Sequence, residues 1–233
     1  EEDISYDDIS QDEFKKEDEW IVSRLNEVIK DVSNYLDKYE IGLGAQRIYE
    51  FIWEDYCDWY IEMVKSRLYG DDKETSIVAQ KVLLYVLKDI LKILHPFMPF
   101  ITEEIWQHLP GNNEALIVSS WPYFKDEFVF RESEQGIEYI KTAIKAIRNA
   151  RAEMNIIPSK KSNIIFVTTD DDISKYIEVG KRYFVNLASA EDIKIFDTKD
   201  GLGEENISIV LDKCQVFLPL KEHFYHFLCD ING

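Results

Sequence analysis

Apolar side chains recur at steps of three and four residues from Trp20 to Met154, and this spacing restricts that part of the chain to packed helices. The first run extends from Trp20 to Tyr39, and we expect Gly42 and Gly44 to break it. Further helices are predicted at about residues 45–69, 74–94, 102–109 and 132–154. Because amphipathic helices bury their apolar stripes against one another, the pattern predicts an antiparallel helix bundle.

The spacing changes after Pro158, where apolar residues alternate with polar ones or form short continuous runs. Strands are predicted at residues 163–169, 193–196, 207–211 and 215–218, and helices at 173–188 and 220–229. Asp212 and Lys213 are expected to form the turn of a hairpin. The predicted fold is therefore mainly α, with a bundle over residues 20–155 followed by a small α+β unit over residues 156–233.

Charge is unevenly distributed along the 233 residues, whose formal net charge is −18. Residues 1–19 hold ten acidic and two basic side chains and lack apolar periodicity, so we interpret them as an acidic linker. Because phosphate binding rests on Lys and Arg, the overall charge disfavours a nucleic-acid partner unless basic residues gather locally.

Neither a membrane span nor a signal peptide is predicted, since the chain has no long uncharged apolar run and no basic-then-apolar leader. The three cysteines, Cys57, Cys214 and Cys229, are widely spaced and odd in number, which indicates free thiols in a reducing compartment. We therefore expect a cytoplasmic protein. The chain starts with Glu1 rather than Met, and we expect it to be part of a longer protein.

No catalytic centre or metal site is predicted in this chain. Its nine glycines are scattered, and none forms a phosphate-binding loop after a predicted strand. Glu103-Glu104 and Asp170–Asp172 fit a helix amino terminus and a solvated turn. His223, His226 and Cys229 lie at three-residue intervals and could gather zinc, but without a second ligand cluster we interpret them as packing residues.

One segment has the opposite charge to the rest of the chain. Residues 141–161 hold one acidic residue and six basic ones: Lys141, Lys145, Arg148, Arg151, Lys160 and Lys161. On a helix the first three share one face that could contact phosphates, whereas Arg151 falls on the apolar stripe and needs a carboxylate or carbonyl partner. A solubilising face paired with the acidic remainder is the alternative, and the residues alone favour it.

The helix predicted at residues 45–69 is the most aromatic of the chain. Its core-facing side chains near the carboxyl end are expected to be Trp59, Tyr60 and Met63. Ile61, Glu62 and Lys65 lie towards the other side, where an apolar side chain beside a carboxylate could stack on an unpaired RNA base and accept its amino group. Most such triplets are ordinary surface, so this pattern alone is weak.

Four motifs occur in order: DEWIVSRLNE at 18–27, FIWEDYCDWYIE at 51–62, LHPFMPFITEEIW at 94–106 and SSWP at 119–122. This succession resembles the helical anticodon-binding domain of class I aminoacyl-tRNA synthetases, over about Trp20 to Leu220. The CDWY and HPFMPF wording, and IRNARAEMNIIPSKK at 147–161, are similar to valyl members rather than to isoleucyl or leucyl ones. Glu19 departs from the family, which usually has Arg there.

The resemblance implies a role in binding the anticodon stem-loop of valine tRNA, without activity of its own. It also implies catalytic and editing domains upstream, where ATP and magnesium act, and a carboxyl-terminal coiled coil downstream; a monomer is expected. By this resemblance, Ile61 and Glu62 lie at anticodon bases. The expected phosphate contacts are Lys65, Arg67, Arg148, Arg151, Lys160 and Lys161. The alternatives are an isoleucyl enzyme's anticodon-binding domain and a stand-alone acidic module that binds a protein.

Overall fold

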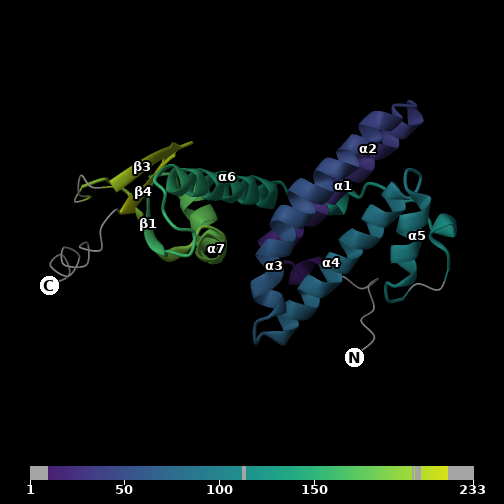
Figure 1. Cartoon of the computed structure of the whole chain (residues 1–233), viewed down its shortest axis with the longest axis horizontal. Coiled ribbons are helices and arrows are strands. Elements are labelled where there is room, and N and C mark those ends of the chain that lie inside the picture. The colour runs from purple at the N-terminus through teal and green to yellow at the C-terminus, as the bar shows by residue number, and fades with distance from the viewer. Residues whose placement is uncertain (1–9, 112–113, 201, 203–205, 220–233) are drawn as a thin grey trace. The chain divides into compact units, whose positions relative to one another are not determined.

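The structure, a computed structural model, describes residues 10–111, 114–200, 202 and 206–219. They form two compact units, one ending at Glu134 and the other starting at Gln135 (Figure 1). The first unit is helical, and the second combines helices with a four-stranded sheet. This architecture confirms the predicted fold class. None of the helices in the described part of the chain is long and apolar enough to cross a membrane.

The first unit is built around two long helices and a third, composite rod. Helix α1 spans Lys16–Asp37 and α4 spans Lys73–Leu94. The rod comprises α2 (Ile41–Glu50), a π-helical stretch, η2 (Phe51–Tyr60), and α3 (Ile61–Leu68). Figure 1 shows α2 and α3 at opposite ends of this rod, which packs along α1. Shorter elements are η1 (Gln11–Glu13), α5 (Pro99–Gln107), η3 (Leu116–Val118) and η4 (Asp126–Phe128).

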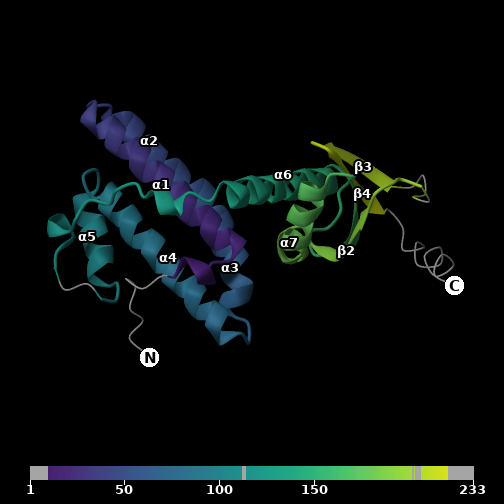
Figure 2. The same cartoon turned by 180° about the vertical axis from the view of Figure 1, so that it is seen from behind.

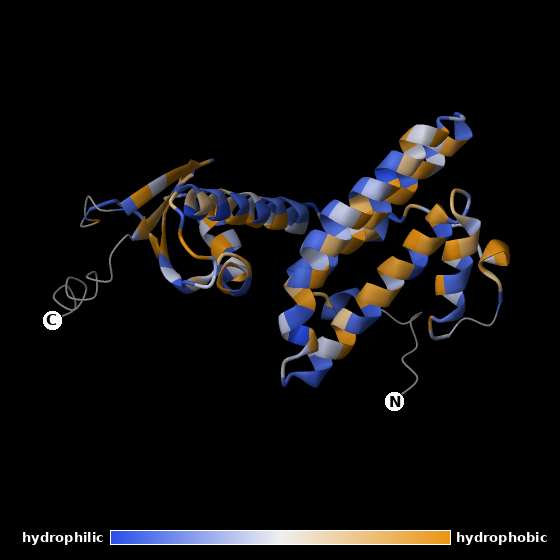
Figure 3. Cartoon of the chain, in the orientation of Figure 1, coloured by the Kyte–Doolittle hydropathy of each residue, from blue (hydrophilic) through white to orange (hydrophobic). Residues whose placement is uncertain are grey.

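The core of this unit forms where the apolar stripes of the helices meet. The stripe of α1 is buried from Trp20 to Val32, whereas Leu36 is half-buried and Tyr39, the last residue of the predicted run, is exposed. Orange marks the apolar residues on the ribbon of this unit (Figure 3). The largest fully buried side chains of the unit are Trp20, Ile21, Leu25, Ile48, Phe51, Tyr60, Met63 and Ile93. The three- and four-residue spacing therefore predicted correctly which faces are buried, although η2 interrupts the α-helical geometry of the rod.

Two helix boundaries differ from the predicted ones because the backbone finds other local solutions. Tyr39, with a φ of 60°, ends the first run in the left-handed region, and the amide of Glu40 closes the turn on the Tyr35 carbonyl at 2.8 Å. Gly42 and Gly44 therefore lie inside α2. Helix α5 begins at Pro99, where proline suits the first turn. Thr102, where this helix was predicted to begin, lies within it and donates to the Met98 carbonyl.

The first long helix begins within the segment that was predicted to be an acidic linker. Helix α1 begins at Lys16, so the last four residues of the predicted linker belong to its first turn. Glu17 and Asp18 are fully buried there. Burial of two carboxylates requires compensation by a cation, which in this protein comes from a distant part of the sequence.

The second unit is an α+β arrangement. Helix α6 spans Arg131–Glu153, and its residues from Gln135 onward belong to this unit. The remaining elements are β1 (Ser162–Val167), α7 (Asp171–Leu187), β2 (Ala190–Phe196), β3 (Asn206–Leu211) and β4 (Cys214–Pro219). The strand order is β2-β1-β4-β3, with β1 and β2 parallel and the other pairs antiparallel (Figure 2). The predicted hairpin turn at Asp212-Lys213 is confirmed, whereas the helix predicted at 220–229 lies outside the described residues.

Helix α7 makes close contacts with both the sheet and α6. The rings of Phe166 on β1 and Phe184 on α7 lie 5.0 Å apart between centroids. Gly180 on α7 faces Ile140 of α6 so closely that an added Cβ would lie 2.9 Å from the Ile140 side chain and 3.1 Å from the Phe184 ring. The helix–helix distance therefore depends on the missing side chain at this position.

Replacing Gly180 by alanine should destabilise the second unit. Overpacking costs about 1–3 kcal/mol, which outweighs the gain of about 1 kcal/mol in helix propensity. Because all five tryptophans precede Gln135, hydrogen exchange of β1 and α7 amides is the suitable measurement. Gly42→Ala is the control, since nothing lies within 4 Å of its added Cβ. Equal protection in Gly180→Ala and the wild type would contradict the packing argument.

Candidate functional site

The turn that opens α3 presents an apolar side chain, a carboxylate and an amine to solvent. Ile61 and Glu62 are half-buried and Lys65 is exposed. The Glu62 Oε1 and Lys65 Nζ atoms lie 2.5 Å apart in an i,i+3 ion pair. The neighbouring core-facing residues Trp59, Tyr60 and Met63 are buried, as predicted. The α3 turn is therefore two-sided, with its inner side chains in the core and its outer ones facing solvent.

Arg67, predicted near phosphates, turns into the protein instead. Its side chain is only 5% exposed, and its Nη1 atom lies 2.8 Å from Glu17 Oε1 and 2.7 Å from Asp18 Oδ2. The other terminal nitrogen donates to the Thr75 carbonyl at 3.1 Å. Tyr60 donates its hydroxyl to Asp18 Oδ1 at 2.7 Å. This geometry favours a structural role for Arg67 over the predicted phosphate contact.

The Arg67 cluster consists of one guanidinium and two carboxylates, all of them buried. Burial, and then the neighbouring Glu17 charge, raises the pKa of Asp18 above its ordinary value. Burial and the Asp18 carboxylate likewise raise the pKa of Tyr60, which keeps its hydroxyl a hydrogen-bond donor. The cluster thus joins the carboxyl-terminal turn of α3 to the first turn of α1 by several charge-assisted bonds.

The basic residues of α6 are divided between the interior and the surface. Lys141 was expected to face solvent but is buried, with its amine 2.8 Å from Glu138 Oε1. Lys145 and Arg148 are exposed, as predicted, and Arg148 Nε donates to the Leu187 carbonyl at 2.5 Å. The prediction of one continuous cationic face was therefore wrong at Lys141, because its ammonium is drawn to the neighbouring carboxylate.

Arg151 holds the loop that follows α6. Its side chain is buried, and its guanidinium donates to the Lys160 carbonyl and the Ser162 hydroxyl. A carboxylate or carbonyl partner was predicted from the apolar stripe, and the structure shows a carbonyl. Burial lowers the pKa of Arg151, whose guanidinium nonetheless stays charged. Lys160 and Lys161 are exposed on this loop, so Arg151 has a structural role in place of the predicted phosphate contact, and the two lysines face solvent.

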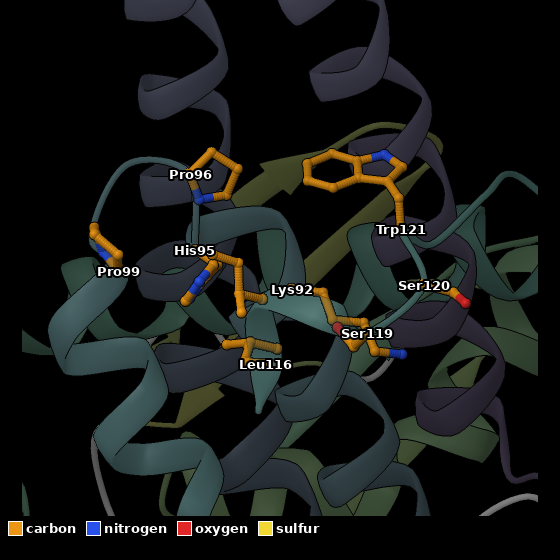
Figure 4. Close-up of a pocket in the computed structure, with 9 residues that line it drawn as sticks. Lys92, His95, Pro96, Pro99, Leu116, Ser119, Ser120 and Trp121 are labelled. Atoms are coloured by element: carbon orange, nitrogen blue, oxygen red, sulfur yellow. The ribbon is translucent and has the colours of Figure 1, made fainter. Parts of the chain in front are cut away.

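A pocket of about 370 Å³ lies at the end of α4 (Figure 4). Its walls are Pro96, Pro99, Leu116, Ile117, Ser119, Ser120, Trp121, Lys92 and His95. The Lys92 amine pairs with Asp89 at 2.8 Å, and His95 Nδ1 lies 2.7 Å from the Thr102 hydroxyl oxygen. This lining has no nucleophile held by a base. Among the described residues, no group of three or more His, Cys, Asp and Glu side chains could hold a metal ion.

Comparison with known proteins identifies the fold. Residues 18–166 match the family model described as the anticodon-binding domain of tRNA ligase. The chain belongs to this family. The matched segment includes the α3 turn, the Lys160-Lys161 loop and, of the Arg67 cluster, Arg67, Tyr60 and Asp18.

Relatives of this anticodon-binding chain are named valine–tRNA ligase. The protein from Clostridium acetobutylicum is 40% identical over 211 residues, which is 91% of this chain and 24% of that relative. The protein from Clostridium tetani is 42% identical over 203 residues, covering 87% and 23%. The protein from Bacillus subtilis is 36% identical over 219 residues, covering 94% and 25%. The chain spans about a quarter of the length of these relatives.

The predicted site residues therefore form two groups in different units. Ile61, Glu62 and Lys65 share the α3 turn, whereas Arg148, Arg151, Lys160 and Lys161 belong to the second unit. Two features were missed from the sequence: the buried pairing of Arg67 and the exposed aromatic rings of the rod. The pairing has no local signal in the sequence, because the two carboxylates lie 49 and 50 residues before Arg67. The rings had a signal in the aromatic richness of residues 45–69.

Replacing Arg67 by methionine should destabilise the helical unit by about 3–5 kcal/mol, since two buried carboxylates lose their cation. Tryptophan fluorescence during urea unfolding measures this, because every tryptophan belongs to that unit. Arg131→Met is the matched control: Arg131 also pairs with two carboxylates but is exposed, so little change is expected. Adding Glu17→Gln and Asp18→Asn to Arg67→Met should restore part of the loss. An Arg67→Met protein as stable as the wild type would contradict the structural role of the Arg67 cluster.

Proposed function

We propose that this chain binds the anticodon stem-loop of valine tRNA as one part of a valine–tRNA ligase. The observation that carries the proposal is the family match over residues 18–166, which includes the solvent-facing α3 turn. The relatives described above are all named for valine, which supports a valyl over an isoleucyl enzyme. An acidic protein-interaction module is the less supported alternative, since the family is defined by anticodon binding.

The α3 turn supplies the contacts that reading an unpaired base requires. The Ile61 side chain offers an apolar surface to a base face, and the Glu62 carboxylate accepts hydrogen bonds from exocyclic amino groups. Glu62 is already paired with Lys65, but exposed ion pairs of this kind contribute little to stability. RNA can therefore replace the pair at small cost, with Glu62 taking a base and Lys65 a phosphate.

Phosphate contacts of the second unit would come from Lys160, Lys161 and Arg148. All three are exposed, and the loop of the two lysines is fixed through the Lys160 carbonyl by Arg151. A fixed loop loses less conformational entropy on binding than a free one. These contacts position the RNA and carry no base information.

The bond-forming steps of the proposed ligase lie on other parts of the enzyme. Residues of this chain neither cradle phosphates in a Gly-rich loop nor, where described, gather metal ligands. We assign ATP and magnesium to a catalytic domain of the parent enzyme, and proofreading to an editing domain, from the resemblance to class I synthetases. The parent enzyme is proposed to be a cytoplasmic monomer, and the free thiols of Cys57 and Cys214 fit a reducing compartment.

Glu62→Gln should weaken binding of a labelled valine-tRNA anticodon stem-loop. Loss of a hydrogen bond to a charged group costs about 1.5–3 kcal/mol, or roughly 10- to 150-fold in Kd. Fluorescence anisotropy with the full chain measures the change. Glu178→Gln, which breaks a similar i,i+3 pair with Lys181 on α7, is the control and should leave the Kd unchanged. Equal affinity of Glu62→Gln and the wild type would remove the α3 turn from the site.

Lys160→Glu should reduce the salt dependence of the same binding. If about four to six phosphates are neutralised, log affinity falls with log salt at a slope of about −3 to −5. Loss of one contact lowers the slope by about 1. Lys175→Glu serves as the control, because Lys175 is an exposed lysine on α7, paired with Asp172. An unchanged slope in Lys160→Glu would exclude this loop from the interface.

A further inference from the structure

Two aromatic rings of the rod face solvent and do not belong to the core of the helical unit. Tyr49 is 63% exposed and Trp53 is 53% exposed. Their ring centroids lie 6.3 Å apart at an angle of 54°, so each ring supports the other. Trp20, Trp59 and Trp106 are buried in the same unit. Adjacent exposed rings on a helix form a continuous apolar surface of the kind that can mark a binding site.

The π-helical stretch connects this pair to the α3 turn. A π-helix turns less per residue than an α-helix, so side chains four residues apart come closer to one line. Tyr49, Trp53, Cys57 and Ile61 are spaced by four, and all are exposed or half-buried. They form one solvent-facing row, the aromatic row, which ends at the residue proposed to contact an anticodon base. π-Helical segments occur often at functional sites.

Carboxylates accompany the aromatic row along its length. Glu50, Glu54, Asp58 and Glu62 each follow a member of the row by one residue and are also exposed or half-buried. Such a line of negative charge repels phosphates, but its oxygens accept hydrogen bonds from base amino groups. The surface therefore suits the faces and edges of unpaired bases, with the RNA backbone directed away from it.

We propose that Trp53, supported by Tyr49, is a stacking site for a further unpaired base of the anticodon loop, next to the bases read at Ile61 and Glu62. The proposal rests on the proposed function and extends the interface along the rod. Stacking accepts any base, because every base has a π-face, and selectivity would come from the flanking Glu54 carboxylate. A basic protein segment is the competing occupant, and the experiment distinguishes it.

The test measures stem-loop binding by Trp53→Ala, Trp53→Phe and a control. Base–aromatic stacking of about 1–3 kcal/mol corresponds to a loss of about 5- to 150-fold in Kd for Trp53→Ala. Trp53→Phe keeps a ring and should retain most of the affinity. Phe100→Ala removes a 90% exposed ring on α5 and should bind as the wild type does.

Abasic substitutions in the loop provide a readout that a merely structural role would not move. Each loop position is made abasic in turn and assayed with wild type and Trp53→Ala. The position stacked on Trp53 should weaken wild-type binding but add nothing in the variant, as a double-mutant cycle requires. In the wild type, RNA should also quench tryptophan fluorescence, and Trp53→Phe should lose most of that quenching.

The outcomes separate this proposal from the one it rests on. If Glu62→Gln weakens binding and Trp53→Ala does not, the stacking site is overturned while anticodon recognition stands. If Trp53→Ala weakens binding of every abasic loop by the same factor as the intact loop, stacking is also overturned. Absence of stem-loop binding by the wild type would overturn both proposals. If, in addition, a basic peptide bound to the aromatic row, the protein-interaction alternative would be favoured.

Discussion

The buried pairing of Arg67 with Glu17 and Asp18 is the interaction on which the site geometry depends. It fixes the carboxyl-terminal end of the rod against the first turn of α1, and the exposed α3 turn begins only six residues before it. A buried ion cluster is a poor source of net stability, because desolvation offsets the Coulomb attraction. Its effect is directional, because the bonds that Arg67 and the Tyr60 hydroxyl make to the Asp18 carboxylate require α3 to be held against the first turn of α1.

With one end of the rod fixed, the π-helical geometry of its middle determines which side chains face solvent. The ten residues of η2 bury Phe51, Trp59 and Tyr60 on one side while keeping Trp53 and Asp58 on the other. A regular α-helix of this length would rotate the outer side chains progressively around the axis. The wider turn instead keeps them close to one line, so the rod has an extended linear surface suited to a single strand.

Most of the fold could be predicted from the sequence because helical burial is periodic and local. The stripe of α1 and the strand pattern after Pro158 needed only neighbouring residues, and both were found in the structure. The α3 turn could be located for the same reason. The features that could not be predicted depend on distant partners. Glu17 was assigned to the linker because its partner, Arg67, is far away in the sequence. The π geometry was likewise missed, since apolar spacing of three and four residues fits both kinds of helix over a few turns.

The distribution of charge explains how a chain with a net charge of −18 can belong to an RNA-binding family. Phosphate contacts set affinity and base contacts set selectivity, and the proposed interface assigns the two to different residues. The rod offers carboxylates and rings, which repel the backbone and accept only unpaired bases. The exposed cations Lys160 and Lys161 lie on a separate loop held by Arg151. An acidic surface disfavours non-specific polyanions, so under the proposed stacking at Trp53 an RNA would bind well only when its loop bases reach the aromatic row.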